Sequence, residues 1–253
     1  MITFSLQSGS NGNCIYVEAG DVRLLFDAGL SGRQAALRMQ QHGRNIRDVD
    51  AVILSHDHAD HVRCAGIYHR LFHLPLYMTR TTHRAITAPL GKLREVRYFR
   101  SGEPIEFGPV TVHTLRTPHD AADAVGFVVE HEGRRLGIFT DLGHPFDRLA
   151  RTLGELDAAY LESNYDVDLL ETGSYPPHLK ARIRGVGGHL SNLEAAELVR
   201  GCGTRRPEWI ALAHLSQENN RPELALETHR ALLGAEYPLV VAGRYAVSEV
   251  LRL

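Results

Sequence analysis

Short apolar runs separated by glycine and charged residues recur along the chain, and their length predicts strands. The expected strands are Ile2–Leu6, Cys14–Glu18, Val22–Phe26, Ala51–Ser55, Leu76–Thr79, Val96–Phe99, Val110–Arg116, Val125–His131, Leu136–Thr140, Ala158–Glu162, Trp209–Ala213 and Pro238–Ala242. Helices are expected from Ser31 to about His42 with Gly43 as C-cap, over Val62–His73 and Leu179–Arg184, after the Ser191–Glu194 capping box, and near Pro222–Leu233. The alternation predicts an α/β or α+β chain with two layers of sheet, as a single domain over residues 1–253.

The composition is that of an ordinary globular protein. The 253 residues are 43% hydrophobic and 23% charged, and the net charge of −2 does not by itself indicate a nucleic-acid binder. Cys14, Cys64 and Cys202 are far apart and form no CxxC pair, which argues against a disulfide framework or a thiolate zinc site. Neither a secretory leader nor an apolar run of roughly 18 residues is visible. We therefore expect a cytoplasmic protein without a membrane partner.

One run of six residues, His56-Asp57-His58-Ala59-Asp60-His61, concentrates metal-binding chemistry after the apolar stretch Ala51–Ser55. Three imidazoles and two carboxylates make little sense in a core, but they suit two cations held side by side. Imidazole and carboxylate ligands fit Zn, Mn or Fe, and the lack of cysteine ligands leaves the metal open. A solvated polar loop is the alternative, which the flanking strand disfavours.

Ligand-type residues also follow four other expected strands: Asp27, His119, Asp141 and His214. Strand ends are where α/β proteins gather their sites. Any one of these side chains alone is more commonly a satisfied polar residue. The pattern at four strand ends, beside the six-residue run, favours a shared site.

The sequence resembles a known superfamily at these positions. HDHADH resembles the HxHxDH signature of the metallo-β-lactamase superfamily, and the four strand-end residues fall in the order of its other motifs. Five stretches resemble the YycJ/WalJ branch, whose members are regarded as nuclease-like hydrolases: 7–13, 27–32, 119–122, 188–192 and 214–220. The resemblance covers almost the whole chain. It implies a four-layer αββα sandwich with the site at one edge between the two sheets.

The resemblance also implies a set of ligands for two divalent metals, Mn²⁺ or Zn²⁺. They are His56, His58 and His119 for one metal, Asp60, His61 and His214 for the other, and Asp141 bridging the two with a water or hydroxide. Two cations a few ångströms apart lower the pKa of a shared water and clamp the reacting oxygens. Two aspartates leave the site electrophilic, which suits an anionic phosphodiester. Asp27 would orient the motif loop or an imidazole, or would simply cap a turn.

Glu162 and His189 are the residues that distinguish among activities. Phosphodiesterase branches of the superfamily, including tRNase Z-like enzymes, carry a Glu–His pair at similar places, so Glu162 is expected to orient His189, which would act as general acid or phosphate contact. Asp60 counts with them as catalytic. Because an alkoxide leaves poorly, a proton donor is worth roughly a hundredfold or more. The alternative without a catalytic role is that His189 is a loop histidine next to a helix cap.

Hydroxyl and amide side chains near these motifs are candidate phosphate contacts: Ser8, Ser10, Asn13, Asn164 and Ser216. A tight hairpin at residues 8–13 and a helix cap after His214 are the alternatives. Two basic segments, 79–100 and 180–184, could form a nucleic-acid track, with Tyr98, Tyr165 and Tyr175 available for stacking, although solvated helix faces are commoner.

The function expected from this reading is a binuclear phosphodiesterase acting on nucleic acid, DNA before RNA. The resemblance implies a 5′ to 3′ DNA exonuclease linked to DNA repair or replication. The alternatives are a thioester or lactam hydrolase of the glyoxalase II or β-lactamase type, and a non-catalytic metal-binding module. A class B β-lactamase is disfavoured because the candidate ligands include no cysteine and the motif ends in His61 rather than arginine. A glyoxalase II-type enzyme would have no evident use for the Glu162–His189 pair. The complete ligand set argues against a non-catalytic module. The chain lacks the inserted nucleic-acid-binding domain of larger nucleases, and its oligomeric state is left open.

Overall fold

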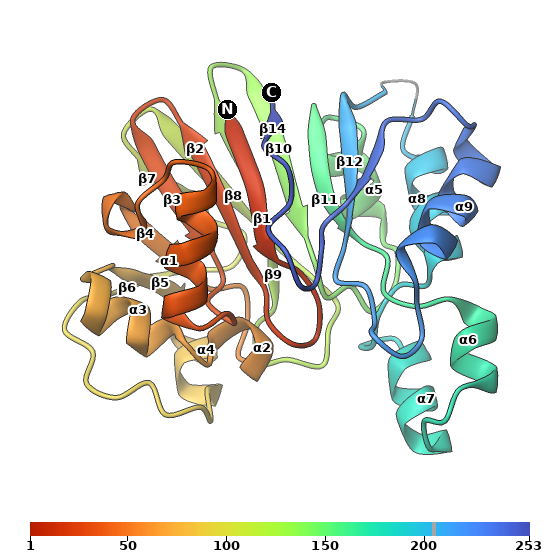
Figure 1. Ribbon diagram of the computed structural model, residues 1–253, viewed down its shortest axis with the longest axis horizontal. Coiled ribbons are helices and arrows are strands. Elements are labelled where there is room, and N and C mark those ends of the chain that lie inside the picture. Colours follow the sequence, from red (N-terminus) through yellow and green to blue (C-terminus); the bar gives the residue numbers. More distant parts are fainter. Residues whose placement is uncertain (204–205) are drawn as a thin grey trace.

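The computed structural model describes residues 1–203 and 206–253. Two mixed sheets face each other, and helices cover both outer faces (Figure 1). Sheet A has the order β14 (Leu251–Arg252), β1 (Ile2–Gln7), β2 (Cys14–Ala19), β3 (Val22–Phe26), β4 (Ala51–Ile53), β5 (Leu76–Thr79) and β6 (Val96–Phe99). Sheet B has the order β13 (Leu239–Val241), β12 (Trp209–Ala213), β11 (Ala158–Glu162), β10 (Arg134–Phe139), β9 (Val125–His131), β8 (Val110–Arg116) and β7 (Ile105–Phe107). The predicted αββα sandwich is confirmed.

The helices divide between the two sheets. Sheet A carries α1 (Gly32–Gln41), the short 3-10 helix η1 (Ile46–Asp48), α2 (Ala59–Val62), α3 (Ala65–Phe72) and α4 (Arg80–Ala85). Sheet B carries α5 (Asp147–Leu153), α8 (Asn192–Gly201) and α9 (Pro222–Leu233). The remaining two, α6 (Val167–Thr172) and α7 (Pro177–Arg184), project from one end of the sheets. Within the described ranges no helix is long and apolar enough to cross a membrane.

The helix predicted over Val62–His73 was wrong at its start. The chain forms α2 inside the metal-binding motif, breaks after Val62, and resumes as α3 at Ala65. The break has a tertiary cause, because the N–H of Cys64 donates to the carbonyl of Ala28 at 2.9 Å. The elements β7, β14, α4, α5 and α6 were not predicted from the sequence, because each spans only a few residues.

Three apolar cores hold the layers together. The central one lies between the sheets and takes residues from both, such as Phe26 and Phe127, whose ring centroids are 5.1 Å apart. The other two lie between each sheet and its helices. The terminal amine of Met1 donates to the carbonyl of Leu253 at 2.7 Å, so both ends join sheet A (Figure 1). That residues 1–253 form a single domain stays a prediction.

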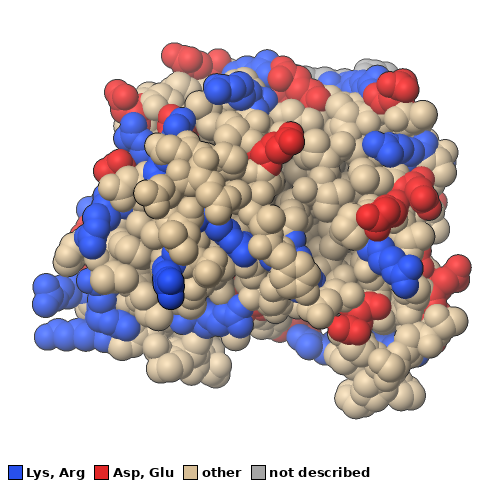
Figure 2. Space-filling model, in the orientation of Figure 1, with Lys and Arg blue, Asp and Glu red and all other residues tan. Residues whose placement is uncertain are grey.

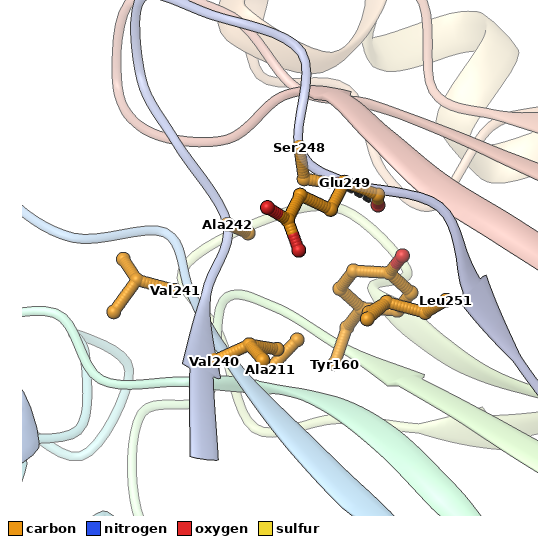
Figure 3. A pocket seen from close by; sticks show the side chains of 8 residues that line it. All are labelled: Tyr160, Ala211, Val240, Val241, Ala242, Ser248, Glu249 and Leu251. Carbon is orange, nitrogen blue, oxygen red and sulfur yellow. Dashed lines mark hydrogen bonds between the residues drawn. The ribbon is translucent and has the colours of Figure 1, made fainter. Parts of the chain in front are cut away.

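A cavity of about 290 Å³ opens between β11–β13 and the C-terminal segment before β14 (Figure 3). Its walls are mostly apolar, with the ring of Tyr160 on one side and the carboxylate of Glu249 at the other. The Tyr160 hydroxyl lies 3.2 Å from the Thr3 hydroxyl. None of the predicted site residues lines this cavity.

The topology brings the predicted strand-end residues to one edge. Each sheet has three antiparallel pairings on one side and three parallel pairings on the other. The carboxyl ends of β3 and β4 in sheet A therefore point the same way, as do those of β8, β10, β11 and β12 in sheet B. Each of these ends is followed by a predicted site residue.

Candidate metal centre

Three site residues adopt a left-handed backbone conformation, which residues other than glycine rarely adopt. Asp27, Asp141 and His214 have φ of 65°, 59° and 55°, and they are three of the five non-glycine residues with positive φ in the described part of the chain. Asp27 and His214 directly follow β3 and β12, and Asp141 lies two residues after the end of β10, where the left-handed conformation turns the chain sharply. Strained conformations of this kind persist where the surrounding structure enforces them, commonly at functional sites.

His56, His58 and His119 form the first candidate ligand group. One ring nitrogen from each lies within 4.8 Å of the others. His119 Nδ1 lies 3.0 Å from the carbonyl of Gly188, so its Nε2 faces His58 Nδ1 at 3.1 Å. His56 Nδ1 contacts the Ser55 hydroxyl at 2.9 Å, whereas its buried Nε2 has no partner among the described residues. An unpartnered buried nitrogen beside two others fits a bound cation.

Asp60, His61 and His214 form the second group, again within 4.8 Å. Asp60 Oδ2 lies 3.5 Å from His61 Nε2 and 3.4 Å from His214 Nε2. The other nitrogen of His61, Nδ1, lies 2.7 Å from Asp27 Oδ2. Asp27 also accepts the backbone N–H of Ser55 at 2.8 Å. Asp27 therefore orients a candidate ligand and the start of the motif, the arrangement that metal-binding histidines usually have.

Asp141 lies between the two groups. Its Oδ2 is 3.1 Å from His61 Nε2, and its Oδ1 is 3.6 Å from His119 Nε2 and 3.6 Å from His214 Nδ1. Oδ2 is buried without a hydrogen-bond donor in the described structure. A carboxylate that reaches both groups and keeps an unsatisfied oxygen fits the predicted bridging position.

The histidine pKa values differ between the two groups, because nearby carboxylates outweigh burial only in the second. Burial lowers the pKa of His56 well below its usual value and also lowers that of His119. Burial acts on His214 in the same sense, but nearby carboxylates, Asp141 foremost, outweigh it and raise the pKa to about 10. The pKa of His61 is raised well above its usual value for the same reason. His56 and His119 thus offer neutral imidazoles, whereas a cation at His61 and His214 would displace protons.

The donor set fits divalent metals. It combines imidazoles and carboxylates without a thiolate, and all three cysteines are free, with Cys14 in the core. These ligands suit zinc and manganese alike. The structure brings the seven predicted ligands together in overlapping groups. The identity and number of the metals stay predictions from the sequence.

Glu162 and His189 also meet at this edge. Glu162 Oε1 lies 2.8 Å from His189 Nδ1 and 2.9 Å from His214 Nδ1. The backbone N–H groups of Leu142 and Leu190 donate to Oε2 at 2.8 and 3.1 Å. Burial opposes ionisation of Glu162, but its histidine neighbours lower the pKa to about 2. Glu162 is therefore a carboxylate that accepts hydrogen bonds from Nδ1 of both imidazoles, while Nε2 of His214 contacts Asp60 Oδ2.

The predicted substrate contacts separate into two sets. Ser10, Asn164 and Ser216 line a pocket of about 230 Å³ together with members of both ligand groups. Ser8 and Asn13 are buried and lie behind the ligands. Ser8 accepts the backbone N–H of His214 at 2.7 Å, and the Asn13 amide lies 2.9 Å from His61 Nε2. The structure thus places Ser8 and Asn13 as supports of the second ligand group.

Several residues of the site escaped sequence reasoning. Arg182, Leu179 and Ile183 of α7 form one wall of the pocket, with Tyr175 before that helix. The sequence predicts only base stacking for Tyr175 and only a place in a basic segment for Arg182. Asp120 Oδ1 lies 3.6 Å from His119 Nε2. Its position next to His119 in the sequence was the one signal that could have placed Asp120 at the site.

The basic segment 79–100 lies on a different flank. Figure 2 shows Lys and Arg side chains gathered on the side where α3, α4 and β6 lie. Arg70, Lys92 and Arg94 line a hollow of about 350 Å³ there. Arg80 stacks over the Tyr98 ring at 4.3 Å from its centroid. Tyr165 is buried and is not available for stacking.

The sandwich with this ligand set defines a metallo-β-lactamase-fold protein, and comparisons agree. The model of the beta-lactamase superfamily domain matches residues 22–210. The metallo-beta-lactamase fold protein YhfI from Bacillus subtilis superposes with a TM-score of 0.74 at 17% identity, covering 98% of this chain and 99% of that one. Such a likeness speaks for the fold alone.

Two curated relatives place the chain more narrowly. Exodeoxyribonuclease YycJ of Bacillus anthracis is 36% identical over 222 residues, which cover 87% of this chain and 84% of that protein. Exodeoxyribonuclease WalJ of Streptococcus pneumoniae is 36% identical over 225 residues, covering 87% and 83%. The chain belongs to the YycJ/WalJ family of the metallo-β-lactamase superfamily. With the ligand set, these relatives support the prediction of a metal-dependent hydrolase.

Proposed function

We propose that this protein is a binuclear metal-dependent phosphodiesterase that degrades DNA as a 5′ to 3′ exonuclease. The carrying observation is the contact of 2.8 Å between Glu162 and His189 beside both candidate ligand groups. The names of the YycJ and WalJ relatives support DNA as the substrate. The cytoplasmic location and the link to DNA repair or replication stay predictions.

The ligands divide the work in this proposal. His56, His58 and His119 would hold one metal, Asp60, His61 and His214 the other, and Asp141 both. Two bound divalent cations would activate a water and neutralise charge on the phosphate. Asp27 and Ser8 keep His61 and His214 in orientation through the contacts described above.

Glu162 and His189 assist the departure of the leaving group. The ionised Glu162 accepts a hydrogen bond from the Nδ1–H of His189, so Nε2 is the ring nitrogen that faces the pocket. From there a protonated His189 delivers a proton to the departing sugar oxygen, which avoids release of a free alkoxide. Ser10, Asn164 and Ser216 lie within the same pocket and can donate to phosphate oxygens.

A substrate panel tests the proposal. Single- and double-stranded DNA and RNA, labelled at either end, are incubated with the protein in Mn²⁺ or Zn²⁺, beside a thioester and the lactam nitrocefin. We expect stepwise loss of DNA from the 5′ end, weaker action on RNA, and no turnover of the thioester or lactam. Turnover of the thioester or nitrocefin with intact DNA would overturn the proposal, and label released first from the 3′ end would overturn its polarity.

A further inference from the structure

Arg182 is held at the edge of the metal pocket by a two-point contact. Its Nε and Nη2 donate to Asp120 Oδ2 and Oδ1 at 2.6 and 3.1 Å. This fork is the arrangement in which arginine binds planar anions most strongly. The side chain of Arg182 nevertheless remains 57% exposed, and it lines the pocket with His58, Asp60 and Asp141.

Asp120 ties this arginine to the first ligand group. Its Oδ1 lies 3.6 Å from His119 Nε2 and 3.7 Å from His58 Nε2. The backbone N–H of Asp120 donates to the carbonyl of Gly187 at 2.9 Å. The loop that carries His119 and the loop that follows α7 are thus joined, and the guanidinium is fixed relative to the candidate metal ligands.

The guanidinium keeps donors for a second anion. Two of its five N–H groups go to Asp120, and Nη1 has no partner among the residues that the structure describes. The other two cations of α7 are used elsewhere. Lys180 donates to the carbonyl of Glu171 at 2.7 Å, and Arg184 pairs with the Glu171 carboxylate. Arg182 is the cation of α7 that lines the pocket.

We propose that Arg182 binds a non-bridging oxygen of the substrate phosphate at this pocket, with Asp120 as the residue that positions it. The inference rests on the proposed function and adds a phosphate-binding residue to it. The permanently charged guanidinium, with Nη1 still available beside the Asp120 contact, suits a phosphate oxygen better than a neutral carbonyl. The rival reading is a structural ion pair that only joins α7 to the 118–120 loop.

Substitutions on α7 separate these readings. R182A should lose about 10- to 100-fold in kcat/KM on 5′-labelled DNA, since charge-assisted hydrogen bonds contribute on that scale. R182K should recover part of the loss, because it restores charge without the fork. R184A is the matched control, an arginine on the same helix outside the pocket, and should stay within about twofold. Metal content and thermal midpoint should match the wild type in all three.

Binding of deoxythymidine 5′-monophosphate, measured by calorimetry on metal-loaded protein, is independent of turnover. R182A should weaken it about 10-fold or more, and equal affinities in R182A and R184A would overturn the inference. D120N should raise KM more than it lowers kcat, with metal content unchanged. Loss of metal from D120N would instead make Asp120 a ligand and overturn its positioning role. A wild type that cleaves no DNA but whose nucleotide affinity depends on Arg182 would reject the proposed function alone.

Discussion

His189 Nδ1 lies 2.8 Å from Oε1 of Glu162, and the same oxygen lies 2.9 Å from His214 Nδ1. One carboxylate therefore orients both the candidate general acid and a candidate metal ligand. A change in the orientation of His189 would therefore alter the hydrogen bonding of His214. Together with the backbone donors Leu142 and Leu190, these contacts satisfy a fully buried glutamate at the end of β11, whose burial alone would be costly.

Replacing His189 should reveal its role through the leaving group. H189A should lose roughly a hundredfold or more in kcat on DNA, where the leaving oxygen needs a proton. On bis(p-nitrophenyl) phosphate, whose leaving group departs unaided, the loss should be far smaller. The ratio of the two losses, measured by steady-state kinetics, is the relevant quantity, and a ratio near one would rule out proton donation.

Metal binding should depend on Asp141. Purified protein should carry about two divalent metals per chain by elemental analysis, because two donor groups share this carboxylate. D141A should lose at least one of them and all measurable nuclease activity. D57N changes a motif carboxylate outside every donor group and should retain both metals. A D141A protein with full metal content would contradict the bridging assignment.

Asp27 should tune metal affinity without touching the metal. D27N keeps the size of the side chain but weakens the charged contact of 2.7 Å to His61. Supporting partners of this kind are typically worth 10- to 100-fold in affinity. Competition with a chromophoric chelator should show the loss at one of the two metals only. Unchanged affinity at both would show that Asp27 serves the turn after β3 rather than the site.

Gly29 is a position where a single methyl group should be damaging. A Cβ there would lie 1.6 Å from the carbonyl oxygen of Asp60 and 2.7 Å from the backbone nitrogen of Asn13. G29A should lower the free energy of unfolding by about 2 kcal/mol or more in urea, since the motif backbone must shift. G201A, where a Cβ meets nothing within 4 Å, should be neutral or slightly stabilising. Equal stabilities would contradict the close approach.

His229 predicts a stability change on acidification. Burial lowers its pKa to about 4, against a weaker opposing effect of its contact with the Ala225 carbonyl. Between about pH 6.5 and 4 the unfolded chain binds a proton that the folded chain does not, so stability falls as pH falls. From pH 7.5 to 5 this residue should cost roughly 2 kcal/mol.

The H229L variant provides the comparison, with urea unfolding of chelator-treated protein at both pH values. The other titrating groups are common to both proteins and cancel in the difference. The variant should lose less stability than the wild type on acidification. An identical loss in the two proteins would show that His229 does not contribute.

The amino-acid sequence alone predicted the candidate ligands and much of the fold. Ligand types at strand ends pointed to the candidate metal centre, and short apolar runs located most strands, because both signals are local along the chain. Other features depend on contacts between segments that are far apart in the sequence. Cys64 breaks a helix because it bonds to Ala28, Ser8 and Asn13 support ligands from behind, and Arg182 meets Asp120 from 62 positions away. Such contacts depend on how distant segments pack, which no local pattern records.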